Sequence, residues 1–336
     1  AIASVAPTAC LSGPKDALHQ LVLISFNNAD EPSGATVLVE GSGWCEETRL
    51  VGIPHGPSEH GILVRAVCAP QTVRFSLRTP EGQTAPIELS WAPPRRWVVH
   101  LVQRSHHDVG YTNMASRVLR EHCEFWESTI EMARATSEYP EDSQFRVVVE
   151  QAWSLLEFLR SAPEEHVEAM HGLIRSGHVE LTALFGNMVT EICGPESILR
   201  ALYPAFALAR EVGVPIVTAE HNDIPGMSWG LCQALTAAGV ELLCPALPRY
   251  WGWQDPPMRS FWDDEALFPQ GQPGAFWWEA PSGRRLLLWD SQGSGGDINP
   301  LLPDLAVRLQ SLCDGGYPYE VIRWPVGGGA RDNAPY

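Results

Sequence analysis

Two short polar segments carry the residue types that bind transition metals. In the first, His106 and Asp108 stand two positions apart, directly after a strand-like run. Because side chains alternate along an extended backbone, His106 and Asp108 point to one side and His107 to the other. An imidazole and a carboxylate together suit Zn²⁺. The spacing is equally typical of a turn in which Asp108 accepts backbone N–H groups, so this segment alone leaves both interpretations open.

The second segment contains His221 and Asp223, and its Pro225 and Gly226 turn the chain into a helix-like run. One interpretation makes Asp223 the N-cap of that helix, and the other makes it a metal ligand. Two such segments on one chain favour a metal site formed by His106, Asp108 and Asp223.

The elements that must position these residues alternate between strand and helix after residue 96. This alternation is typical of parallel strands joined by right-handed crossovers. We expect seven strands, at Trp97–Gln103, Arg146–Glu150, Val179–Ala183, Ile216–Ala219, Val240–Leu243, Leu286–Trp289 and Val321–Trp324. We expect helices at Asn113–Thr136, Ala152–Leu159, Glu164–Ile174, Pro195–Val212, Met227–Ala238 and Leu305–Cys313. The predicted fold class is α/β, a seven-stranded parallel β/α barrel.

In such a barrel the chemistry lies at the carboxyl ends of the strands. Polar residues follow these ends, although the strands were chosen without regard to them: His106, Asp108, Glu150, Asn187, Glu220, His221, Asn222, Asp223, Asp290 and Asp332. Their gathering on one rim predicts an enzyme.

Residues 19–92 are different in pattern, with six short strand-like runs between turn residues. These runs are Leu21–Phe26, Ala35–Glu40, Arg49–Ile53, Ile62–Val67, Val73–Leu77 and Ile87–Trp91. They predict a small all-β sandwich in front of the barrel. A proline-rich linker near residues 92–95 divides the chain into predicted domains 1–95 and 96–336.

Composition excludes several classes of function. The 23 basic and 40 acidic residues give a net charge of −17, which disfavours binding to the nucleic-acid backbone. No apolar run is long enough to span a membrane, and no signal peptide is visible, so we expect a soluble protein. The eight cysteines form no CxxC motif. The compartment stays open, as does the question of whether the chain forms a homo-oligomer.

Aromatic residues are concentrated between Pro245 and Pro281, and this segment is predicted to be a long loop. Trp251 and Trp253 would stack on sugar faces, or the loop would pack on itself over the barrel. Glu150, at a strand end, would bond a substrate hydroxyl, orient a metal ligand or serve as a buried structural partner.

The segment Ser105-His106-His107-Asp108-Val109-Gly110-Tyr111 resembles the opening motif of the family 38 glycoside hydrolases, the zinc α-mannosidases. Asp223-Ile224-Pro225-Gly226-Met227-Ser228 resembles their second motif. The resemblance covers about residues 97–336 and implies the family's seven-stranded β/α barrel.

Carried over to this chain, the resemblance implies that His106, Asp108 and Asp223 bind zinc and that Asp223 is also the nucleophile of a retaining glycosidase. Asp332 is the candidate general acid. Tyr111 stands where the family has a tryptophan in the sugar site, and we expect Tyr111, Glu150, His221, Trp251 and Trp253 to contact an oligosaccharide or glycoside. The family's fourth zinc ligand is a later histidine; His221 is the last histidine of this chain, so no residue here matches it, and whether it lies beyond Tyr336 stays open.

Two alternatives remain open. A metal-dependent carbohydrate deacetylase also uses His and Asp around zinc on a β/α rim. A non-catalytic sugar-binding protein, or an inactive fragment, would bind a sugar without turning it over.

Overall fold

The computed structural model describes residues 1–29, 33–98, 100, 102–110, 113–224, 227–246, 275–289, 304–315 and 321. The fold consists of two compact units, Ala1–Val99 with Ile298–Pro318, and His100–Asp297 with Tyr319–Tyr336. Each is described by itself, and the predicted domain boundary at residues 95 and 96 stays a prediction. Among the described helices, none has the length and apolar character needed to cross a membrane.

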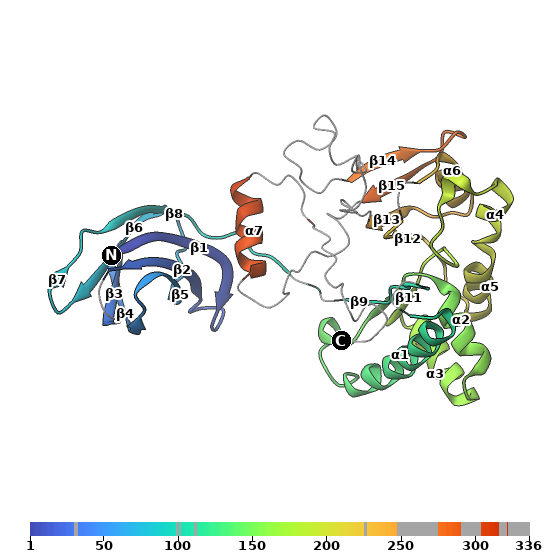
Figure 1. The fold of residues 1–336 in the computed structure, drawn as a ribbon, viewed down its shortest axis with the longest axis horizontal. Coiled ribbons are helices and arrows are strands. Elements are labelled where there is room, and N and C mark those ends of the chain that lie inside the picture. Colours follow the sequence, from blue (N-terminus) through green and yellow to red (C-terminus); the bar gives the residue numbers. More distant parts are fainter. Residues whose placement is uncertain are drawn as a thin grey trace. The chain divides into compact units, whose positions relative to one another are not determined.

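The first unit contains two antiparallel sheets (Figure 1). One sheet has the order β1 (Ile2–Ser12), β2 (His19–Asn28), β5 (Gly56–Arg65). The other contains β4 (Trp44–Ile53), β3 (Ser33–Gly41) and β6 (Gln71–Thr79), with β7 (Gly82–Gln83) and β8 (Ile87–Trp91) both paired to β6. One apolar core includes Val22 and Ile24 of the first sheet and Val37 and Phe75 of the second. The two-sheet arrangement agrees with the predicted sandwich.

Two strands of this unit were not predicted, β1 and β7. The residues of β1 alternate poorly and include Pro7. Proline is tolerated there because β1 is an edge strand that pairs only with β2. The last described helix, α7 (Asp304–Asp314), belongs to the same compact unit.

The second unit contains two short sheets. One has the parallel order β11 (Val179–Leu181), β10 (Val147–Val149), β9 (Gln103–Arg104). The other has the order β12 (Thr218–Asn222), β13 (Leu242–Ala246), β15 (Arg285–Trp289), β14 (Ala275–Glu279), of which the first three are parallel. The Ala183 amide donates to the Thr218 carbonyl at 3.0 Å, so β12 follows directly beside β11.

The predicted seven-stranded parallel barrel is therefore not shown. Five of its predicted strands overlap β10, β11, β12, β13 and β15, and the first, Trp97–Gln103, shares only Gln103 with β9. In addition, β14 is antiparallel to β15 and falls in the segment predicted to be a loop. Of the seventh, Val321–Trp324, Val321 is described outside any strand and the other residues lie outside the described part. The described fold is a mixed α/β arrangement.

Helices separate most of these strands, close to the predicted positions. They are α1 (Ala115–Ala135), α2 (Ala152–Ser161), α3 (Glu164–Arg175), α4 (Pro195–Arg200), α5 (Tyr203–Val212) and α6 (Trp229–Ala237), with 3₁₀ turns η1 (Glu141–Ser143) and η2 (Thr190–Ile192). The predicted helix Pro195–Val212 is two helices, because Pro204 lies in the first turn of α5 and lacks the N–H that would continue α4. The helices and both sheets share one apolar core.

Candidate active site

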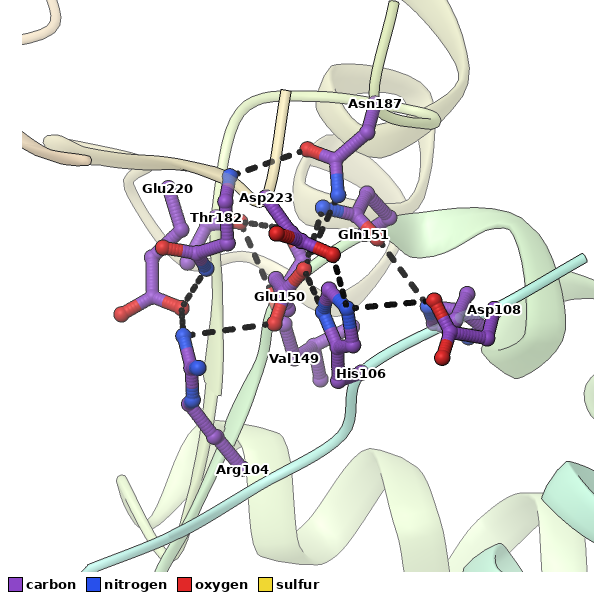
Figure 2. A network of polar contacts seen from close by, with 12 residues as sticks. Arg104, His106, Asp108, Val149, Glu150, Gln151, Thr182, Asn187, Glu220 and Asp223 are labelled. Atoms are coloured by element: carbon purple, nitrogen blue, oxygen red, sulfur yellow. Dashed lines mark hydrogen bonds and ion pairs between the residues drawn. The ribbon is translucent and has the colours of Figure 1, made fainter. Parts of the chain in front are cut away.

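Three side chains from two strand ends converge on one point (Figure 2). His106 Nε2 lies 3.6 Å from Asp108 Oδ1 and 3.9 Å from Asp223 Oδ2. One ligand atom from each of the three residues lies within 4.8 Å of the others. His106 and Asp108 follow β9, and Asp223 follows β12. Because these strands run parallel within neighbouring sheets, their carboxyl ends meet at the same edge.

Asp223 has a left-handed backbone, with φ of 54°. Aspartate tolerates this conformation better than most residues, and strained conformations of this kind gather at functional sites. The N-cap of α6 is Ser228, whose Oγ accepts from the Leu231 amide at 3.3 Å. The interpretation of Asp223 as the cap of this helix is therefore wrong, and its carboxylate is available for other partners.

Behind His106 lies Glu150, whose carboxylate is fully buried. Glu150 Oε1 accepts hydrogen bonds from His106 Nδ1 at 2.9 Å, Gln151 Nε2 at 2.9 Å and Asn187 Nδ2 at 3.0 Å (Figure 2). Thr182 Oγ1 lies 2.8 Å from the carbonyl oxygens of both Val149 and Glu150. The end of β10 is therefore held from β11, and His106 is held with Nε2 toward the two aspartates.

A guanidinium lies between two carboxylates at the same edge. Arg104 Nη1 is 3.4 Å from Glu150 Oε2 and 3.6 Å from Glu220 Oε2. Asn222 Nδ2 donates to Glu220 Oε2 at 3.1 Å, and the Asn222 amide donates to Asn187 Oδ1 at 3.2 Å. These contacts tie the residue before Asp223 to the surroundings of His106.

Negative charge dominates the electrostatics of the site. Burial by itself lowers the pKa of His106, but the Glu150 charge and the contacts with Asp108 and Glu150 outweigh it and raise the pKa to about 10. Burial alone would raise the pKa of Glu150, yet the charges of His106 and Arg104 hold it below its usual range. Burial, together with the charges of Asp108 and Glu150, raises the pKa of Asp223. The three carboxylates thus favour positive charge at this point.

His107 points away from the site, as the alternation of side chains predicts. Its Nδ1–H donates to Gln151 Oε1 at 3.0 Å, and its Nε2 accepts from Ser154 Oγ at 2.7 Å. Its ring stacks on His122 with 4.0 Å between the centroids. Burial is the main cause that lowers the pKa of His107 to about 3, so it is neutral at pH 7.

The donor set fits a zinc ion. Zinc holds nitrogen and oxygen ligands at about 2.0–2.2 Å, which places ligand atoms of a tetrahedral site about 3.3–3.6 Å apart. The measured 3.6 and 3.9 Å need only small side-chain movements to reach this spacing. The bond from His106 Nδ1 to Glu150 is the second contact that metal-binding histidines regularly make.

The other predicted site residues divide into two groups. Glu150 and His221 are fully buried, and His221 Nε2 donates to the Met188 carbonyl at 3.0 Å. Burial lowers the pKa of His221. Tyr111, Trp251, Trp253 and Asp332 lie outside the described residues.

Sequence reasoning placed Asn187, Glu220 and Asn222 on the rim but gave them no role, and it gave none to Arg104. The one feature of the sequence that could have identified these four residues was their position near the ends of predicted strands. Their partners could not be read from sequence, because each contact joins residues of different strands or loops.

A protein-family profile described as "Glycosyl hydrolases family 38 N-terminal domain" matches residues 96–291. The comparison with curated protein sequences finds no match.

Several solved structures are similar to the chain. A protein in glycosyl hydrolase family 38 from Enterococcus faecalis is 14% identical with a TM-score of 0.44, and 68% of this chain and 23% of that chain are covered. An alpha-mannosidase from Enterococcus faecalis V583 is 16% identical with a TM-score of 0.46, with 63% and 22% covered. A 4-alpha-glucanotransferase from Thermococcus litoralis is 13% identical with a TM-score of 0.43, with 67% and 32% covered.

The chain spans less than a third of the length of each of these three proteins. The family profile, in contrast, covers more than half of this chain. The chain therefore belongs to glycosyl hydrolase family 38, whose N-terminal domain it contains, and the resemblance seen in its two motifs is confirmed.

Proposed function

We propose that this protein is a zinc-dependent retaining glycoside hydrolase that acts on α-linked sugars, with α-mannosides as the first substrates to test. The observation that carries the proposal is the convergence of His106, Asp108 and Asp223 at one edge of parallel strands in a chain of this family. The substrate is an oligosaccharide or glycoside.

His106 Nε2, Asp108 Oδ1 and Asp223 Oδ2 would hold the zinc ion. When bound, zinc supplies a Lewis acid that holds the hydroxyl groups of the sugar and keeps Asp223 ionised.

Asp223 is the proposed nucleophile, and 31% of its side chain is exposed. Its carboxylate attacks the anomeric carbon, the glycosidic bond breaks, and a general acid protonates the departing oxygen. The residue that acted as the general acid then removes a proton from a water molecule, and this water hydrolyses the covalent sugar ester on Asp223. In retaining enzymes the two carboxyl groups are about 5–5.5 Å apart. Asp332 stays the predicted acid.

The remaining predicted contacts divide by burial. We keep Tyr111, Trp251 and Trp253 as proposed sugar-binding residues. For Glu150 and His221, which are fully buried, we propose support of the site from behind instead of contact with the sugar.

The first experiment measures zinc content by metal analysis in wild-type protein, Asp223→Asn and Asp142→Asn. The last makes the same change at an exposed carboxylate of η1. About one zinc per chain is expected in wild type and Asp142→Asn, and much less in Asp223→Asn.

The second experiment uses a dinitrophenyl α-mannoside, whose leaving group departs without a general acid. Asp223→Asn should lower the rate by about 10³-fold or more. A fluorinated mannosyl fluoride should label Asp223, which peptide mass spectrometry detects. A label on another residue, or an inverted product, contradicts the proposed mechanism. Acetate release from an acetylated sugar would indicate the deacetylase, and sugar binding without turnover would indicate a binding protein.

A further inference from the structure

Five residues form a closed circuit of polar contacts, here called the polar ring: Arg104, Glu150, Asn187, Asn222 and Glu220. Asn222 takes part through both its backbone amide and its side chain, and the other four through their side chains. The contacts run from Arg104 to Glu150 at 3.4 Å, to Asn187 at 3.0 Å, to Asn222 at 3.2 Å, to Glu220 at 3.1 Å, and back to Arg104 at 3.6 Å. These residues come from the ends of β9 and β10, the loop after β11, and β12. The ring therefore joins both segments that carry the proposed metal ligands.

Glu150 is the member of the ring that contacts a proposed ligand directly, through His106 Nδ1 at 2.9 Å. A carboxylate only accepts hydrogen bonds, so His106 must carry a hydrogen on Nδ1. When the imidazole releases its other proton to bind a metal, the lone pair is on Nε2, which lies 3.6 Å from Asp108 Oδ1 and 3.9 Å from Asp223 Oδ2 (Figure 2). The contact with Glu150 therefore fixes both the tautomer and the orientation of the His106 imidazole.

The polar contacts of Glu150 engage both of its carboxylate oxygens. Three donors occupy its Oε1, and the Arg104 guanidinium faces its Oε2. A buried ion pair is weak evidence for stability, because desolvation offsets the attraction between the charges. The many contacts of the buried Glu150 carboxylate are better explained by the orientation that it imposes on His106.

We propose that Glu150 is a positioning residue that sets the tautomer and orientation of His106 for metal binding, and that the polar ring holds it in place. This inference rests on the proposed function. It assigns no contact between Glu150 and the sugar.

The test compares Glu150→Gln with Glu220→Gln. Both replacements neutralise a carboxylate that faces Arg104 Nη1, but only Glu150 touches His106. Zinc affinity is measured by competition with a chromophoric chelator, and circular dichroism checks that both variants fold. Glu150→Gln should weaken zinc binding by about 10–100-fold, and Glu220→Gln by less than about tenfold. An unchanged affinity in folded Glu150→Gln, or an equal loss in both variants, overturns the inference.

A second readout needs no metal. In metal-free protein labelled with ¹⁵N-histidine, the hydrogen bond to Glu150 should give His106 a slowly exchanging Nδ1–H signal, assigned by its absence in His106→Asn. The signal should persist in Glu220→Gln and exchange faster in Glu150→Gln, because the neutral amide oxygen of glutamine is a weaker acceptor than a carboxylate. If the Nδ1–H signal responds to the two variants as expected but wild type binds no zinc, the proposed function is wrong, while the hydrogen bond between His106 and Glu150 is confirmed. If the signal is absent from wild type, the positioning role fails independently.

Discussion

At the scale of single residues, Asp223 combines a proposed chemical role with an unusual backbone. Among the described residues, it is the one non-glycine residue with a positive φ, 54°. The sequence marked this position through Pro225 and Gly226, which require a turn, but the turn alone could not distinguish a helix cap from a ligand.

The backbone of Asp223 gives a prediction that is independent of metal. Asp223→Gly should be more stable than Asp223→Ala by about 0.5–1 kcal/mol, because a Cβ is unfavourable in the left-handed region. Urea unfolding in the presence of a chelator measures this. At Asp108, whose φ is not positive, the order should reverse. The same order at both positions would contradict the strained conformation.

The residues of the site differ in how far the sequence could identify them. His106 and Asp108 follow from the alternation of an extended strand, and His107 was correctly turned away. The partnership of Glu150 with Arg104 could not be predicted, because a buried carboxylate at a strand end looks the same in sequence whether it faces substrate or protein.

At the scale of elements, helices were predicted better than strands. The predicted helix Met227–Ala238 differs from α6 by one or two residues at each end, although Ser228 caps α6 and Asp223 does not. In contrast, β14 contains Trp277 and Trp278 within an aromatic-rich segment, where neither alternation nor flanking turns separate a strand from a loop. Pairing with β15 decides its structure.

The cap of α6 gives a second prediction. Ser228→Ala should lower the free energy of unfolding by about 1 kcal/mol, because the Leu231 amide loses its acceptor. Ser228→Asp should restore most of it. Ser116→Ala, an exposed serine of α1 without a capping role, should be neutral or slightly stabilising. Chemical denaturation of the three variants checks this, and an equal loss in Ser116→Ala would contradict it.

At the scale of the whole molecule, the net charge of −17 makes stability sensitive to high pH. One buried group adds to this effect. Cys232 of α6 is fully buried, its Sγ–H donates to the Trp278 carbonyl at 3.5 Å, and burial raises its pKa to about 11. In the unfolded chain a thiol ionises near pH 8.5.

Cys232 therefore contributes stability that is fully present below about pH 8.5 and is lost as the pH rises toward 11. In this window the unfolded chain releases a proton that the folded chain keeps, which costs at most about 1.4 kcal/mol per pH unit. Cys232→Ser keeps a donor for Trp278 but does not ionise. If Cys232→Ser is less stable than wild type at pH 8.5, the difference between their free energies of unfolding, measured by urea unfolding, should become smaller as the pH rises to 10.5. A constant difference would contradict the assignment.

The division into a β-rich first part and an α/β second part was predictable, because the period of the apolar pattern changes near residue 96. The predicted seven-stranded barrel is not shown, since β14 is antiparallel to β15 and most of the predicted strand Val321–Trp324 lies outside the described residues.

The amide of Ala183, bonded to Thr218, connects the sheet that carries His106 to the sheet that carries Asp223. Thr218 Oγ1 adds a bond to Glu180 across the same seam at 2.7 Å. Opening this seam would separate the two halves of the proposed metal site without unfolding either sheet. The exchange rate of one backbone hydrogen, that of Ala183, would thus report how often these two halves separate.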